Sequence, residues 1–137
     1  MRLAPFEPTH LFAFTPQGPQ KPYVEFMTPD IAAAASGYFA FTGFDDREAI
    51  IGCAGLAPFG ADLVAWAVFS PLLFAHKRAV VRAVKAGLDL HVGRRILAHV
   101  DPAHDKAARF AEALDFAIAG RVAHPNGRDV LLYARER

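Results

Sequence analysis

The chain has 137 residues, of which 53% are hydrophobic, and its formal net charge is +1. This hydrophobic fraction excludes a disordered protein, and the length suffices to bury the core of one domain, which we expect to span residues 1–137. The near-neutral charge gives no electrostatic basis for binding nucleic acid or an acidic membrane surface.

Cys53 is the only cysteine, so the chain can form no internal disulfide, as is typical of a reducing compartment. Residues 1–10 contain a glutamate and two prolines in place of the apolar core of a signal peptide. The most apolar window, residues 61–75, carries Asp62 and Pro71 and is too short to span a bilayer. We therefore expect a soluble, cytoplasmic protein with no membrane segment.

The first third of the chain is rich in proline and predicts little regular structure. Residues 2–6 read as a short edge strand, because Pro5 cannot donate to a central ladder. Thr9 could cap a brief helical turn that ends at Phe14, and residues 15–22 read as loop.

A short helix is predicted over residues 28–37, with Thr28 as its N-cap, Pro29 at its first position and Gly37 at its end. Aromatic and β-branched residues separated by turn residues then predict a run of antiparallel strands. These strands cover residues 38–44, 49–57 and 61–69, with turns at 45–47 and 58–60.

A longer helix is predicted over residues 71–91, where apolar and basic residues alternate at helical spacing. Ser70 would be its N-cap, Pro71 would start it, and Gly93 would end it. The remaining elements are a strand at 94–100, a helix at 102–115 and strands at 117–124 and 129–135, the last two joined by a turn at 125–127.

This order predicts an α+β fold with a mixed, mostly antiparallel sheet flanked by helices. The strands at 61–69 and 94–100 are joined through a helix, so they should be parallel neighbours with a right-handed crossover.

The order of elements and the segment 94–135 resemble the GNAT superfamily of N-acetyltransferases. In that family the fifth strand precedes a helix of pattern Asn-x-x-Ala-x-x-x-Tyr-x-x-x-Gly-Phe and then two more strands. When the pattern is aligned on Phe116, its Asn, Ala, Tyr and Gly positions hold His104, Ala107, Ala111 and Asp115.

The resemblance implies that the parallel strands 61–69 and 94–100 splay apart. Backbone groups near Val68 would then bind the pantetheine arm of acetyl-CoA, the implied co-substrate, as an added strand would. The pyrophosphate would lie at the start of the following helix. The implied activity is a GNAT-like, acyl-CoA-dependent N-acyltransferase that acetylates an amine of a small molecule or a protein.

The family's glycine-rich phosphate loop has no counterpart here, since residues 70–79 contain no glycine. The basic side chains His76, Lys77 and Arg78 could bind phosphate instead, or they could simply form a solvated helix face. The residues that we expect at the cofactor site are Val68, Ser70, Lys77, Arg78 and His104.

The catalytic residues stay unassigned from the sequence. Ala111 replaces the tyrosine that often protonates the departing thiolate in the family, and no other tyrosine is an obvious substitute. Glu48 and Asp62 lie near strand starts, where turn and surface roles are expected. No histidine or cysteine spacing predicts a metal site; we expect His99 to be a hydrogen-bonded histidine lining the sheet.

A second reading remains open. The Trp66-x-x-x-Ser70 end of the central strand also resembles some phage-encoded GNAT-like proteins, which implies a structural or host-directed role. The alternative is therefore a catalytically inactive GNAT-fold binding or virion-associated protein, with a homodimer as an open question. An open gap between strands 61–69 and 94–100 would favour the enzyme.

Overall fold

The computed structural model describes residues 1–24, 28–35, 38–125 and 127–136. The predicted helix end at Gly37 and the turn residue Asn126 lie outside these ranges. The strands are β1 (Arg2–Pro5), β2 (Phe39–Phe44), β3 (Ile50–Phe59), β4 (Asp62–Phe69), β5 (Arg95–Val100), β6 (Ala117–Ala123) and β7 (Asp129–Glu136). The helices are α1 (Lys21–Val24), α2 (Pro29–Ala35), α3 (Leu73–Asp89) and α4 (Asp105–Ala113), with short 3-10 turns η1 (Pro8–Phe12) and η2 (Gly18–Gln20).

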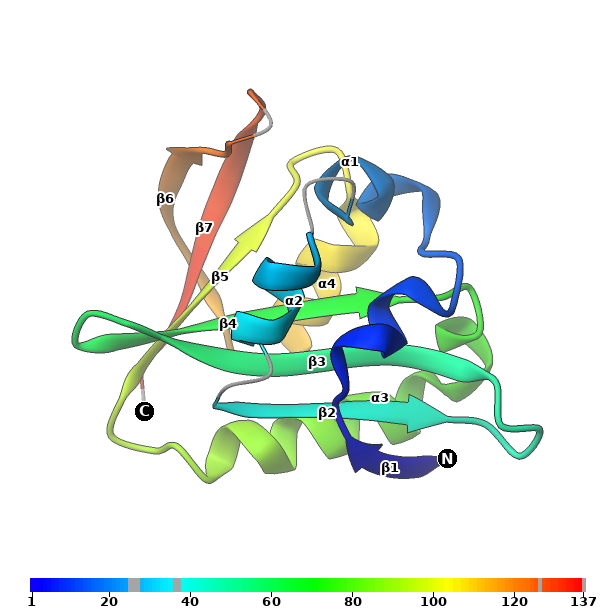
Figure 1. The fold of residues 1–137 in the computed structure, drawn as a ribbon. Helices are drawn as coiled ribbons and strands as arrows, with labels where there is room; N and C mark the ends of the chain where they lie inside the picture. The colour runs from blue at the N-terminus through cyan, green and yellow to red at the C-terminus, as the bar shows by residue number, and fades with distance from the viewer. Residues whose placement is uncertain (25–27, 36–37, 126, 137) are drawn as a thin grey trace.

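The strands form one seven-stranded sheet in the order β1-β2-β3-β4-β5-β7-β6 (Figure 1). Every pair of neighbours is antiparallel except β4 and β5, which are parallel. The predicted mixed, mostly antiparallel sheet flanked by helices is thus confirmed, with β1 at its edge where Pro5 requires it.

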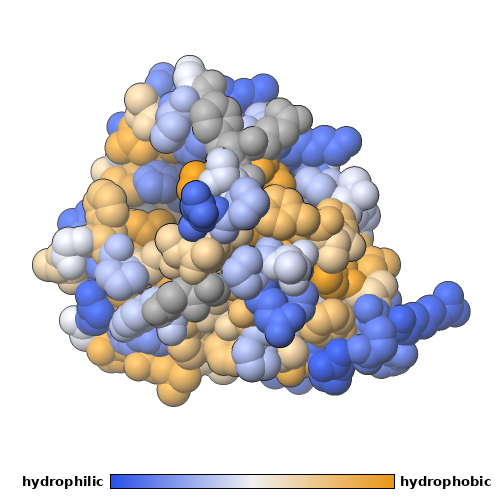
Figure 2. Space-filling model, in the orientation of Figure 1, coloured by the Kyte–Doolittle hydropathy of each residue, from blue (hydrophilic) through white to orange (hydrophobic). Residues whose placement is uncertain are grey.

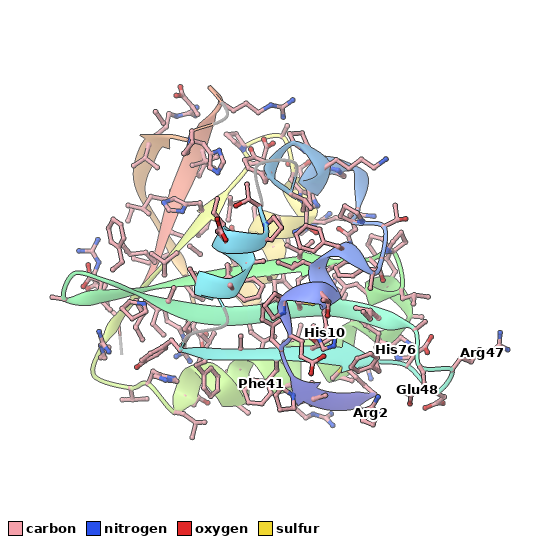
Figure 3. All side chains as sticks on the ribbon, viewed as in Figure 1. Arg2, His10, Phe41, Arg47, Glu48 and His76 are labelled. Atoms are coloured by element: carbon pink, nitrogen blue, oxygen red, sulfur yellow. The ribbon has the colours of Figure 1, made fainter. Side chains whose placement is uncertain are left out.

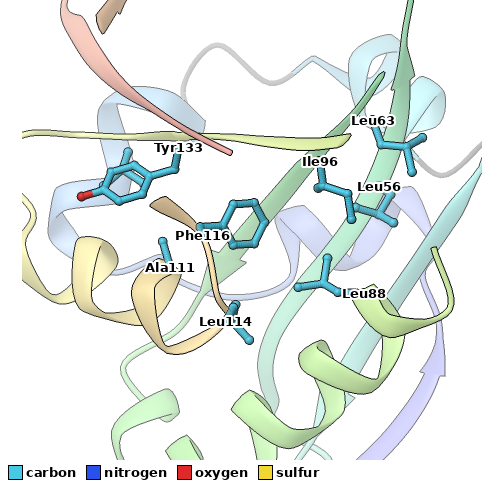
Figure 4. Packing of buried hydrophobic residues seen from close by; sticks show 9 residues of the cluster. Leu56, Leu63, Leu88, Ile96, Ala111, Leu114, Phe116 and Tyr133 are labelled. Carbon is cyan, nitrogen blue, oxygen red and sulfur yellow. The ribbon is translucent and has the colours of Figure 1, made fainter. Parts of the chain in front are cut away.

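The helices α3 and α4 cover one face of the sheet. Their apolar stripes bury Leu88, Ala111 and Leu114 against Ile96 of β5 and Tyr133 of β7 (Figure 4). Burial of this apolar surface is the main force that holds both helices on the sheet.

The opposite face carries η1, α1 and α2. Phe6, Leu11 and Ala32 pack there against Cys53 of β3 and Val68 of β4. Hydrophobic and hydrophilic side chains are interspersed on the outer surface of this layer, and the β2–β3 turn projects beside it as a hydrophilic extension (Figure 2). The central strands β3 and β4 are therefore covered by apolar layers on both faces, which explains why β4 reads as an almost continuous apolar run.

Several predicted boundaries differ from the structure. The ladder between β3 and β4 continues to the pair Phe59–Asp62, so the turn lies at residues 60–61 and not at 58–60. The helix α3 begins at Leu73, because the Ser70 hydroxyl and carbonyl accept the N–H groups of Leu72 and Leu73 in a turn that precedes it. The prediction of loop at 15–22 is wrong, since η2 and the start of α1 lie there.

The end of α4 explains the glycine of the family pattern. The Phe116 N–H donates to the Ala111 carbonyl at 3.0 Å, a bond that wraps the chain around the helix end. This wrap requires a left-handed residue between them, and Asp115 has φ 70°. Aspartate tolerates that conformation better than most residues, although glycine adopts it without strain.

We expect Asp115→Gly to be more stable than Asp115→Ala by about 1 kcal/mol, because alanine keeps the left-handed strain and gains nothing. Both variants lose the partly exposed Lys85–Asp115 ion pair at 3.5 Å, so that loss cancels in the comparison. Urea unfolding of the two variants measures the difference. An alanine variant as stable as the glycine variant would contradict this explanation of the pattern.

Candidate active site

The parallel strands β4 and β5 pair over a short distance only. Their register covers three residue pairs, from Leu63–Ile96 to Ala65–Ala98. Beyond them, β4 stays paired with β3 up to Phe69, and β5 stays paired with β7 up to Val100. The carboxyl ends of the two strands therefore part, and Figure 1 shows β5 turning away from β4 toward α1 and α4.

The edge of β4 that faces this gap presents backbone groups of alternate residues. The Ser70 N–H donates to the Ile51 carbonyl of β3, so Ser70 and, two residues earlier, Val68 turn their backbone toward β3. Ala67 and Phe69 consequently turn theirs toward the gap. The pantetheine contact expected near Val68 is available on its two neighbours instead.

The side-chain amide of Gln20 occupies this edge. Its Oε1 accepts the Phe69 N–H at 2.8 Å, and its Nε2 donates to the Ala67 carbonyl at 3.1 Å. The backbone N–H of Gln17 donates to the Phe69 carbonyl at 2.9 Å. The Gln20 amide thus forms hydrogen bonds with the Phe69 N–H and the Ala67 carbonyl, as the backbone of a neighbouring strand would. The edge is thus built to bind amides.

A cleft of about 710 Å³ includes this gap and continues between α3 and the sheet as far as β1 and β2. Residues from both faces of the sheet line it, so the gap connects the α1 side with the space beside α3 and α4. Besides Gln17 and Gln20, the polar side chains on the α1 side are Tyr23, His99, Asp101 and His124, and those near the starts of α3 and α4 are Lys77, His104 and Lys106.

Asp101 follows directly after β5 and is the central hydrogen-bond acceptor on the α1 side of the cleft. Its carboxylate accepts the Tyr23 hydroxyl at 2.8 Å, the Arg128 Nη1 at 3.3 Å and the Ala103 N–H at 2.9 Å. Burial opposes ionisation, but these donors outweigh it and hold the pKa of Asp101 below its ordinary value. Burial and the neighbouring carboxylate raise the pKa of Tyr23, so this phenol stays protonated.

His99 is the first residue of β5 beyond the last pair with β4. Ala98 and Val100 point to the α3/α4 core, so the intervening His99 points to the α1 side. Desolvation, and after it the nearby His124, lowers the pKa of His99, so its ring is neutral at pH 7. The predicted hydrogen-bonded role is wrong as far as the described residues go, because none of them forms a hydrogen bond with the His99 ring.

The predicted cofactor residues do not all meet at the cleft. Val68, Lys77 and His104 line it, with the Val68 side chain packed into the α2 layer. The Ser70 hydroxyl is turned away and donates to the carbonyls of Ile50 and Ile51. Arg78 lies exposed on α3 and is not part of the lining.

His76, one of the candidate phosphate partners, lies beside the β2–β3 turn (Figure 3). The pKa of Asp45, at the start of that turn, is lowered mainly by the backbone N–H groups of Ala49 and Arg47, with a smaller contribution from His76. The backbone at His76 also leaves helical geometry, with φ −122° and ψ 17°, which marks a kink in α3.

The first turn of α3 does not form the phosphate cradle that a glycine loop provides. The N–H groups of Leu73, Phe74 and Ala75 donate to the carbonyls three residues earlier, and Pro71 has no N–H. Two ammonium groups remain as phosphate partners at this end of the cleft. One is Lys77, and the other is Lys106, whose Nζ lies 4.2 Å from the centre of the Phe74 ring.

Two further kinds of site have little support. Burial raises the pKa of the Cys53 thiol to about 11, which excludes a reactive thiolate at neutral pH. Within the described ranges no three His, Cys, Asp or Glu residues gather as metal ligands do. None of the helices described there is long and apolar enough to cross a membrane.

Sequence reasoning missed Gln17, Gln20, Tyr23 and Asp101. Gln17 and Gln20 lie in the predicted loop 15–22, and Tyr23 follows it directly. Only the docking of this segment beside β4 brings the three residues to the cleft. Asp101 carried a usable signal, because a polar residue directly after a buried strand lies at the carboxyl edge of the sheet.

No protein-family model matches the sequence, and no curated protein does. Solved structures do resemble it. A GNAT-family acetyltransferase from Bacillus anthracis has 21% identity and a TM-score of 0.69, over 98% of this chain and 94% of that one. A mutant of the spermidine N-acetyltransferase SpeG from Vibrio cholerae has 14% identity and a TM-score of 0.69, over 99% of this chain and 95% of that one.

A chimera of the Vibrio enzyme with hSSAT is similar over a shorter range. It has 17% identity and a TM-score of 0.55, over 71% of this chain and 65% of that one. At such identities the likeness concerns the fold. Together with the sheet order, the parallel pair and its split, it shows that this chain has the fold of the GNAT-family acetyltransferases.

Proposed function

We propose that the protein is an N-acetyltransferase that moves the acetyl group of acetyl-CoA to an amine. The observation that carries this proposal is the split between β4 and β5 after Ala65 and Ala98, with amide-binding backbone groups on its β4 edge. If the split between the strands served packing alone, neither the cleft nor the polar side chains on its α1 side would be needed.

The amide-binding edge fits the pantetheine arm, which itself contains amides. We propose that one of them takes the place of the Gln20 side chain on Ala67 and Phe69. Lys77 and Lys106 would neutralise the phosphates, since the first turn of α3 has no free amides for them. The thioester would then lie in the gap, where an amine can reach it from the α1 side.

The work of the protein in this reaction is mainly positioning. Backbone groups at the β4 edge would fix the thioester, and the cleft would restrict the directions from which an amine can attack. We place the reaction in the cytoplasm, a proposal supported by the single cysteine, which is a free thiol.

A GNAT-fold binding protein without cofactor chemistry is the second candidate. The observation in its favour is the first turn of α3, whose amides are already bonded within the turn. Ala111 agrees with it, because a buried methyl group can donate no proton to a thiolate.

Saturating acetyl-CoA is expected to raise the melting temperature by several degrees, because a ligand at about 100 times its Kd stabilises the native state by about 2.7 kcal/mol. Adenosine 3′,5′-bisphosphate, which lacks the pantetheine arm, should shift it much less. Release of the CoA thiol, followed with a thiol reagent over a panel of amines, tests the transfer itself. No shift and no thiol release would leave the binding protein as the better reading.

A further inference from the structure

We propose that His99 is the general base that takes a proton from the acceptor amine. The proposal rests on the proposed function and names the residue that the sequence left unassigned. Its starting point is the position of His99, the first residue of β5 that β4 no longer accompanies.

The position places the imidazole where the two substrates would meet. A thioester held on Ala67 and Phe69 lies in the gap, and His99 projects from the opposite wall of that gap toward the α1 side. An amine that enters from the α1 side therefore passes His99 before it reaches the carbonyl carbon. The other wall offers Trp66 and Val68, which have no group that accepts a proton.

The ring of His99 is chemically free for this role. No hydrogen bond from the residues described in the structure engages it, and it is exposed to the cleft. Its lowered pKa keeps the lone pair available at neutral pH. The charged and titratable groups around this end of the cleft are Tyr23 on α1, Asp101 and Arg128, His104 and Lys106 at α4, and His124 after β6.

The neighbouring groups are less suited to accept a proton. Tyr23 is protonated and donates to Asp101, and the carboxylate of Asp101 already accepts three donors. His104 lies at the start of α4, beside the phosphate end of the cleft. His99 is thus the group at the split that combines an available lone pair with access to the amine.

The step balances without any further reagent. His99 takes one proton of the acceptor ammonium and releases it to solvent. The nitrogen lone pair attacks the carbonyl carbon, a C–N bond forms, and the C–S bond breaks. The second proton of the nitrogen goes to the departing thiolate, so the products are the N-acetylated amine and CoA.

The test replaces His99 with glutamine or alanine. We expect kcat to fall by about 10²- to 10⁴-fold while the Kd of acetyl-CoA stays within about threefold of wild type. Since the base must be neutral, wild-type kcat should fall as the pH drops through the lowered pKa of His99. The variants should lack the plateau that wild type reaches above that pKa, because their kcat should keep rising with pH. Added imidazole should restore part of the activity of His99→Ala.

His91→Gln is the matched control, because that histidine bonds the Gly87 carbonyl at the end of α3 and should leave kcat unchanged. The proposal is overturned if His99→Gln keeps activity within about threefold of wild type with the same pH profile. It is also overturned if imidazole fails to rescue a folded His99→Ala that binds acetyl-CoA normally. If wild type itself neither binds acetyl-CoA nor releases thiol, the proposed function has failed, and this assignment with it.

Discussion

Gln20→Ala is expected to bind acetyl-CoA about 5- to 150-fold more tightly than the wild-type protein. In the free protein the Gln20 amide bonds the Ala67 carbonyl and the Phe69 N–H, the two groups proposed to bind pantetheine. Each such hydrogen bond contributes about 0.5–1.5 kcal/mol, so an incoming amide must displace two bonds worth about 1–3 kcal/mol together. Alanine removes the competitor, and titration calorimetry with acetyl-CoA measures the change in Kd.

The ligand-free Gln20→Ala protein should lose stability by a similar amount, because nothing then pairs the edge of β4. Gln17→Ala is the matched control: its amide Nε2 reaches the Ser70 carbonyl at 3.4 Å, away from both pantetheine partners, so its Kd should not fall. Unchanged or weaker binding by Gln20→Ala would show that the cofactor does not use this edge.

The sequence predicted the fold from signals that are local. The succession of strands and helices along the chain and the parallel pair follow from periodicity, turn residues and chain order, and the structure confirms them. The helix pattern ending in Phe116 works in the same way, since a left-handed Asp115 and a wrapping bond are properties of one helix end. Such features can be predicted from residues that are close together in the sequence.

The site could not be predicted to the same depth, because contacts between distant segments define it. Gln20 reaches β4 across 47 residues of sequence, and Tyr23 reaches Asp101 across 78. The number of residues that β4 and β5 pair before they part is likewise set by their other neighbours, β3 and β7. His99 became a candidate only when that point was known.

Asp89→Ala is expected to lower the free energy of unfolding by about 2–4 kcal/mol, a large loss for a carboxylate whose side chain is 48% exposed. The reason is its partner. Arg135 of β7 has a side chain only 1% exposed, and its Nη2 donates to the Asp89 carboxylate at 2.6 Å. Removing Asp89 leaves a buried guanidinium without its counter-ion, at the point where β7 meets the end of α3.

A double-mutant cycle separates this charge effect from packing. Arg135→Met keeps most of the apolar volume and removes the charge, but it also removes the donor to the Leu114 carbonyl at 3.0 Å, so we expect a cost of about 1–3 kcal/mol. In the Arg135→Met background, Asp89→Ala should then cost less than about 1 kcal/mol. Asp46→Ala, in the exposed β2–β3 turn, is the control and should stay within about 0.5 kcal/mol in urea unfolding. Equal costs for Asp89→Ala in both backgrounds would mean that solvent, and not Asp89, compensates the buried charge.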